Sequence, residues 1–237
     1  MESRAPEAIR AALARALGGV RPAGRAFGPE SLRPAGRPLG LDSTPPAAVA
    51  AVKIGMAVGP ATAAALIEAL SGFAGPVVVD PVLATSRGGA LWNGPPQELL
   101  PLLRRATLVT PNALEAAALS GRSVATIAEA EAAGRHLVEV EGLQAVLVKG
   151  GHLADAGGSL TDLLVTSSGT TRYPHRRAPG ASPRGTGCAL ATAIAVELGR
   201  GRPLGEAIAT AINWLAAAIA AATSVGNERH LTHEGGP

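Results

Sequence analysis

The sequence Thr107-Leu-Val-Thr-Pro-Asn-Ala-Leu-Glu-Ala-Ala-Ala-Leu119 (TLVTPNALEAAAL) joins an apolar segment to a helical one. Thr107–Thr110 predicts a buried strand, and Ala113–Leu119 predicts a short helix. The same alternation continues on both sides, with strands expected at 52–56, 76–80 and 145–149 and helices at 60–70, 95–103, 126–140, 186–198 and 203–222. Strands that alternate with helices form a largely parallel sheet with helices on both faces. The sequence therefore predicts an α/β protein.

Two local patterns refine this prediction. The segments 160–166 and 170–174 are separated by Ser-Ser-Gly, which favours a hairpin. Thr126 and Glu129 have the spacing of a capping box, which predicts the start of a helix at this point. Two helices are expected to finish the chain.

The composition fits a globular protein of a reducing compartment. The chain has 237 residues, of which 47% are hydrophobic, so a sizeable core can be buried. One cysteine excludes an internal disulfide framework and favours a cytoplasmic location. The charged N-terminus does not resemble a secretory signal. The Ala-rich segment Ala207–Thr223 contains Asn213 and predicts a buried or interface helix rather than a membrane span.

The charge balance does not indicate a nucleic-acid-binding protein. The isoelectric point is about 9.7, but the net charge is only +3 and aromatic residues make up 2%. The basic residues are 19 Arg and 2 Lys. The two lysines, Lys53 and Lys149, therefore stand out, and each lies in a strand-like segment that ends in glycine.

Residues 1–50 differ in composition from the rest of the chain. Residues 6–18 predict a helix, whereas 19–46 contain five Gly, six Pro and four Arg and show no periodicity. We therefore expect an atypical N-terminal segment, 1–50, followed by one domain, 51–237.

Polar side chains follow three of the expected strands. Ligands bind at the carboxyl ends of the strands in open parallel sheets, where Asp80, Asn112 and Lys149 are placed. Asp80 and the pair Asn112 and Glu115 are candidates for holding Mg²⁺, and Lys149 for binding phosphate. The structural alternatives stay open: a turn at Asp80, a helix cap at Asn112 and an ordinary strand-end lysine.

The sequence Gly185-Thr-Gly-Cys188 lies at the start of the expected helix 186–198, which is rich in small residues. Its backbone amides and the helix dipole are suited to binding an anion. A thiol in the first helical turn is expected to have a lowered pKa, which would make Cys188 a base or a nucleophile. The alternative is an inert, buried cysteine beside a tight turn.

Taken in order, these motifs resemble the hydroxymethylpyrimidine/phosphomethylpyrimidine kinases of thiamin biosynthesis, which belong to the ribokinase-like superfamily. The resemblance runs from about Ala50 to about Gly201. It implies a three-layer α/β/α fold with a central, mostly parallel sheet. It is carried by AVKIGM (51–56), VVVDPVLATS (77–86), LVTPNALEAAALSG (108–121), AVLVKGGHL (145–153), DLL (162–164) and GTGCALATAIA (185–195).

The resemblance implies a kinase that uses ATP and Mg²⁺. Cys188 would be the base, with Gly185, Thr186 and Gly187 completing an anion hole. Lys149 would bind the ATP phosphates together with the 185–188 loop and Asn112, while Glu115, Asp80 and Asn112 would organise Mg²⁺. Met56 and Val82 would line the pyrimidine pocket. A homodimer is also implied, with no membrane or nucleic-acid partner; a pyridoxal-type kinase is the nearest rival.

The chain departs from the family pattern at its N-terminus. The family's first strand, its G-x-D-x-S-G-G-A-G type loop and a pyrimidine-contacting Gln do not occur in residues 1–50, so N-terminal strands are expected to be missing or replaced. Three interpretations stay open. The segment serves another hydroxymethyl substrate, the sequence is a damaged or shifted form of an ordinary kinase, or the domain binds ligands without turnover.

Overall fold

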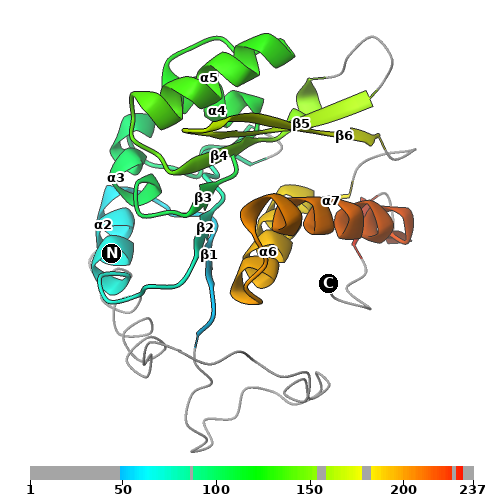
Figure 1. Ribbon diagram of the computed structural model, residues 1–237, viewed down its shortest axis with the longest axis horizontal. Helices are drawn as coiled ribbons and strands as arrows, with labels where there is room; N and C mark the ends of the chain where they lie inside the picture. The colour runs from blue at the N-terminus through cyan, green and yellow to red at the C-terminus, as the bar shows by residue number, and fades with distance from the viewer. Residues whose placement is uncertain (1–48, 86–87, 154–158, 178–182, 226–227, 232–237) are drawn as a thin grey trace, which may run out of the picture.

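The computed structural model describes residues 49–85, 88–153, 159–177, 183–225 and 228–231. The helix and loop expected within 1–46 lie outside these residues. In the described part, six strands form one sheet in the order β1-β2-β3-β4-β5-β6 (Figure 1). The strands are β1 (Val52–Ile54), β2 (Val77–Val79), β3 (Leu108–Val109), β4 (Ala145–Val148), β5 (Ser159–Thr166) and β6 (Gly169–Arg176).

The first four strands are parallel, and the last two form an antiparallel hairpin. The hairpin turns at the expected Ser-Ser-Gly sequence, and Thr166 pairs with Gly169. Among the described residues β1 is an edge strand that pairs only with β2. The mostly parallel sheet predicted from the sequence is confirmed.

Helices cover both faces of the sheet (Figure 1). A short 3₁₀ segment, η2 (Pro96–Leu99), leads into α3, and a second, η3 (Gly150–His152), follows β4. On one face lie α2 (Pro60–Ala69), α3 (Leu100–Leu103), α4 (Ala113–Ser120) and α5 (Ile127–Glu139); on the other lie α6 (Thr186–Gly199) and α7 (Leu204–Ala220).

Side-chain alternation along the strands creates a separate core on each face. Val77 and Val79 pack under α2–α5, whereas Val78 packs with Ile194 and Ile208 of α6 and α7. Each fully buried Val, Leu or Ile contributes about 1.5–3 kcal/mol relative to an exposed one, so these two cores hold the layers together. The sheet is thereby fixed between two layers of helices.

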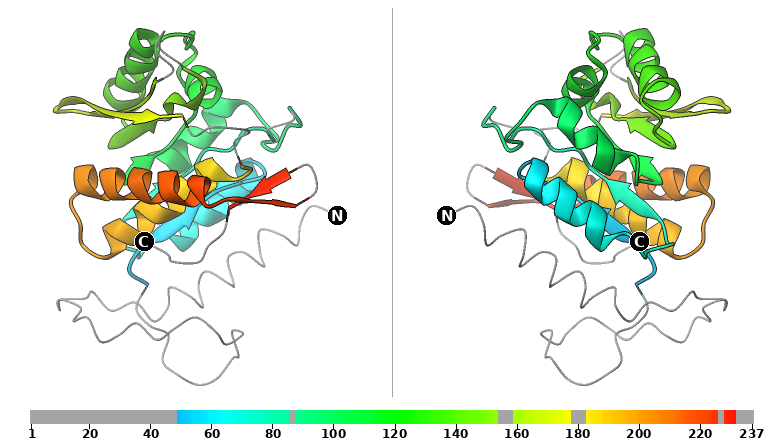
Figure 2. Two further views of the ribbon diagram at one scale, coloured as in Figure 1. Left: turned by 90° about the vertical axis from the view of Figure 1, so that its right-hand side faces the viewer. Right: turned by 90° about the vertical axis from the view of Figure 1, so that its left-hand side faces the viewer.

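The end of the chain differs from the prediction. The chain does not finish with two helices, because a hairpin of β7 (Thr223–Val225) and β8 (Glu228–His230) follows α7 (red in Figure 2). Strands of three residues are too short to show an alternating pattern. None of the helices in the described ranges is long and apolar enough to cross a membrane.

Candidate active site

Three predicted residues meet at the carboxyl end of the sheet. Asp80 follows β2 and is 1% exposed. Its Oδ1 lies 2.7 Å from the Lys149 ammonium, and its Oδ2 accepts a hydrogen bond from the Cys188 thiol at 3.2 Å. Asp80 therefore connects the end of β4 to the first turn of α6.

Thr110 and Glu115 enclose this cluster. The Thr110 hydroxyl donates to Asp80 Oδ1 at 3.3 Å, and Thr110 is completely buried. Glu115 Oε2 lies 3.9 Å from Lys149 Nζ. Burial raises the pKa of Glu115, and the Lys149 charge opposes that rise. Lys149 is thus held between two carboxylates.

Asn112 caps α4, as the structural alternative predicted. Its side-chain oxygen accepts the Glu115 amide hydrogen at 2.9 Å, and Glu115 Oε2 accepts that of Asn112 at 2.8 Å. Such a reciprocal cap satisfies two amides that have no helical partner. It also fixes Glu115 beside Lys149, so one motif serves both the helix start and the site.

The turn after Lys149 is fixed by Asp162, for which no role was predicted. Asp162 of β5 accepts the Gly150 amide hydrogen at 2.6 Å, and burial raises the pKa of Asp162. A Cβ atom on Gly150 would overlap the carbonyl oxygen of Thr161, so only glycine fits here. Asp162 is the first residue of the DLL motif, which was the only sequence signal for it.

The first turn of α6 faces the same cluster. Gly185 begins the helix at φ +78°, a conformation that favours glycine. The first helical hydrogen bond is donated by the Ala189 amide to the Gly185 carbonyl at 2.9 Å, so the amides of Thr186, Gly187 and Cys188 have no helical acceptor. No side chain of the described residues caps this turn. These amides are therefore available for an anion.

Close packing joins α6 to the end of β4. A Cβ atom on Gly187 would lie 3.1 Å from Lys149 Nζ. The absence of a side chain at Gly187 thus allows the ammonium to lie against the helix. The sequence prediction that Asp80, Lys149, Glu115 and Gly185–Cys188 share one crevice agrees with these positions.

The prediction of a lowered pKa for Cys188 is wrong. Cys188 is exposed, but partial burial and the adjacent Asp80 carboxylate raise the pKa of its thiol. The charges of Lys53 and Lys149 act in the opposite direction and do not outweigh them. The thiol donates its hydrogen bond to the Asp80 carboxylate, and this contact favours the protonated form of Cys188.

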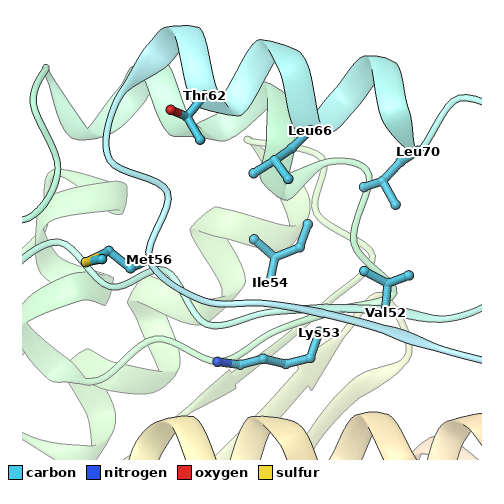
Figure 3. A pocket seen from close by; sticks show the side chains of 7 residues that line it. All are labelled: Val52, Lys53, Ile54, Met56, Thr62, Leu66 and Leu70. Carbon is cyan, nitrogen blue, oxygen red and sulfur yellow. The ribbon is translucent and has the colours of Figure 1, made fainter. Parts of the chain in front are cut away.

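The two residues predicted to line a pyrimidine pocket follow β1 and β2. Met56 is 56% exposed, and Val82 is half-buried directly beyond Asp80. Met56 lines an open groove of about 260 Å³ along β1 and α2 (Figure 3). Its other lining residues are Val52, Lys53, Ile54, Thr62, Leu66 and Leu70.

This fold and cluster define a ribokinase-like small-molecule kinase. The phosphomethylpyrimidine kinase family model matches residues 44–233. A hydroxymethylpyrimidine/phosphomethylpyrimidine kinase of Rhizobium meliloti is 41% identical over 192 residues, which cover 78% of this chain and 70% of that protein. The chain belongs to the phosphomethylpyrimidine kinase family, as its motifs predicted.

Solved structures give the same class. A Bacillus subtilis pyridoxal kinase in complex with ADP is 25% identical, with a TM-score of 0.68 over 78% of this chain and 70% of that one. A phosphomethylpyrimidine kinase of Clostridium difficile is 28% identical, with a TM-score of 0.60 over 73% and 70%. A Staphylococcus aureus hydroxymethylpyrimidine/phosphomethylpyrimidine kinase is 33% identical over 156 residues. The match covers 65% of this chain but only 56% of the length of that kinase.

Proposed function

We propose that the protein transfers the γ-phosphoryl group of ATP to 4-amino-5-hydroxymethyl-2-methylpyrimidine, to its monophosphate, or to both, in thiamin biosynthesis. The observation that carries this proposal is the contact of Asp80 with both Lys149 and Cys188 at the first turn of α6. Membership of the family supports the choice of a pyrimidine substrate. A cytoplasmic location and a homodimer belong to the same proposal.

Cys188 and the α6 amides have distinct tasks in this reaction. Cys188, once ionised, accepts the proton of the substrate hydroxyl. The substrate oxygen forms its bond to the γ-phosphorus as the bond between the γ-phosphorus and the β–γ bridging oxygen breaks. ADP leaves with the bridging oxygen. The amides of Thr186, Gly187 and Cys188 bind the charge that develops on the transferred group. Lys149 neutralises phosphate charge from the other side.

The donor set fits Mg²⁺, which is part of the proposal. Among the described residues no group of three or more His, Cys, Asp or Glu side chains converges on one point. Mg²⁺ is usually held by one or two carboxylates together with water and substrate phosphates. Asp80 and Glu115, with the neighbouring Asn112, would hold it, and when bound it would neutralise charge on the phosphates.

A pyridoxal-type kinase is a second candidate, since a Staphylococcus aureus pyridoxal kinase in complex with an ATP analogue and pyridoxal has a TM-score of 0.67 over 76% of this chain and 66% of that one. A ligand-binding homologue without turnover is a third, favoured by the raised pKa of Cys188. These candidates share the nucleotide side and differ in substrate and in turnover.

One assay separates the three. ADP release by the full chain is measured with ATP and Mg²⁺ against hydroxymethylpyrimidine, its monophosphate and pyridoxal. We expect turnover on at least one pyrimidine. Turnover on pyridoxal alone would select the second candidate, and nucleotide binding without ADP release on any substrate would select the third.

A further inference from the structure

Lys53 and Lys149 are the two lysines of the chain, and Lys53 has no role in the proposed mechanism. It lies on β1 and pairs with Val78 of β2, whose side chain packs under α6 and α7. Neighbouring residues on adjacent strands share a face, so Lys53 points to the α6 side of the sheet. Figure 3 agrees: Val52 and Ile54 point toward α2, whereas Lys53 lies on the other side of the strand.

The Lys53 ammonium lies at the carboxyl end of β1. A Cβ atom on Gly55 would be 2.7 Å from Lys53 Nζ, so the side chain runs forward along the strand and over this glycine. The Asp80 amide donates to the Ile54 carbonyl at 2.8 Å, which places the end of β1 next to Asp80. Lys53 therefore reaches the same edge of the sheet as the candidate active site.

The positive charge of the Lys53 ammonium is not neutralised by a described residue. Lys53 is half-buried, and its side chain makes no hydrogen bond or ion pair with the described residues. Lys149, in contrast, is bound to Asp80 at 2.7 Å. Burying part of an ammonium that has no partner among the described residues is costly, which favours an anionic ligand here.

The two lysines lie on opposite sides of β2, the strand that leads to Asp80. Lys149 follows β4, two strands from β2 on the side of α4 and the nucleotide residues. Lys53 lies on β1, the strand next to β2 on its other side, and the same strand leads to Met56. Lys53 is thus on the side of the acceptor rather than of the nucleotide.

We infer that Lys53 binds the phosphate group of a phosphorylated acceptor and so favours the pyrimidine monophosphate over the free alcohol. The inference rests on the proposed function and adds the acceptor's charge to it. An ammonium is a compact point charge that suits a phosphate oxygen. By this inference, Lys53 binds the phosphate of the acceptor, whereas Lys149 and the α6 amides bind the phosphoryl group that is transferred.

The test compares two acceptors in the full chain. The specificity constants kcat/KM for the monophosphate and for the alcohol are measured in the parent, in Lys53→Met and in Lys53→Arg. Hydrogen bonds to charged groups contribute about 1.5–3 kcal/mol, so the ratio of the two constants should fall about 10- to 100-fold in Lys53→Met. Lys53→Arg should recover most of the ratio. An equal loss on both acceptors would overturn the inference.

Two further variants keep the test independent of folding. Gly55→Ala retains the charge of Lys53 but moves its ammonium group, so this variant should lower the same ratio of kcat/KM values. Arg122→Met removes an exposed cation beyond the C-terminal end of α4 and should leave the ratio unchanged. A lowered ratio in Arg122→Met as well would mean that net charge, not Lys53, sets the preference.

A binding measurement separates this inference from the proposed function. Calorimetric titration of the monophosphate and of the alcohol needs no turnover. We expect the monophosphate to bind the parent more tightly than it binds Lys53→Met, and the alcohol to show a smaller difference. If the parent released no ADP, the proposed function would fail while this titration still decided the role of Lys53.

Discussion

The two ends of the parallel part of the sheet are built differently. At the ends of β2, β3 and β4, polar groups of the site are fixed by hydrogen bonds: Asp80 by Thr110, Glu115 by Asn112, and the turn after Lys149 by Asp162. At β1, the outermost strand of the described sheet, Met56 is exposed beside an open groove. The first region is preorganised, whereas the second is open.

This difference fits the proposed phosphoryl transfer, in which the first region would bind the nucleotide and the second the acceptor. Positioning and charge stabilisation at the phosphates supply most of the catalysis, so the nucleotide side must be rigid. The acceptor side sets specificity and can change with the substrate. The departure from the family pattern falls in residues 1–50, next to β1 in sequence, while the motifs around β3, β4 and α6 keep their order.

The largest effect is expected at the junction of the two regions. Cys188→Ala removes the proposed base, and since general acid–base catalysis contributes about 10²–10⁴-fold, kcat should fall by that factor. ATP affinity should change little, because the α6 amides and Lys149 remain. Steady-state kinetics and nucleotide titration measure both. Val196→Ala, an exposed position two turns further along α6, serves as the control. Full activity in Cys188→Ala would refute its role as the base.

A second prediction probes the rigidity of the nucleotide side. Gly150→Ala forces a methyl group against the Thr161 backbone, and overpacking of this kind costs about 1–3 kcal/mol. We expect a lower Tm and an ATP KM raised about 10-fold or more, since Lys149 must move with the turn. Gly151→Ala is the matched control, because a Cβ atom there meets no atom within 4 Å. Equal behaviour of the two variants would show that the turn is not rigid.

The sequence predicted the regular elements well where local chemistry determines them. The capping box of Thr126 and Glu129 begins α5 as predicted, and Ser-Ser-Gly turns the β5–β6 hairpin. Both signals depend on residues close in sequence. The β7–β8 hairpin was missed because its strands have three residues each.

The site was predicted only in part, because several of its properties depend on distant residues. Asp80 contacts the thiol of Cys188 across 108 positions. Partial burial, together with this carboxylate, raises the thiol pKa, which is the opposite of the expected direction. Asp162 supports Lys149 only because β4 pairs with β5. Strand ends and glycines in the sequence identify the edge of the sheet, but they do not reveal which side chains meet there.

A third prediction tests that missed support. Asp162→Ala removes the acceptor of the Gly150 amide and leaves a buried donor unpaired, which costs about 1–3 kcal/mol. The ATP KM should rise up to about 10-fold with a smaller change in kcat, because the residue acts by positioning Lys149. Asp162→Asn keeps an acceptor oxygen and should restore most of the affinity. If Asn behaved like Ala, the charge of Asp162 rather than its hydrogen bond would be what matters.

The smallest effect is expected in the open region. Met56→Ala removes an exposed side chain, so stability should change by less than about 0.5 kcal/mol. If Met56 contacts the pyrimidine, losing part of that apolar surface costs about 1 kcal/mol and raises the pyrimidine KM several-fold, with the ATP KM unchanged. Leu114→Ala, 74% exposed on α4, is the matched control. An unchanged pyrimidine KM would mean that the acceptor binds away from this groove and that the openness of β1 has no part in substrate choice.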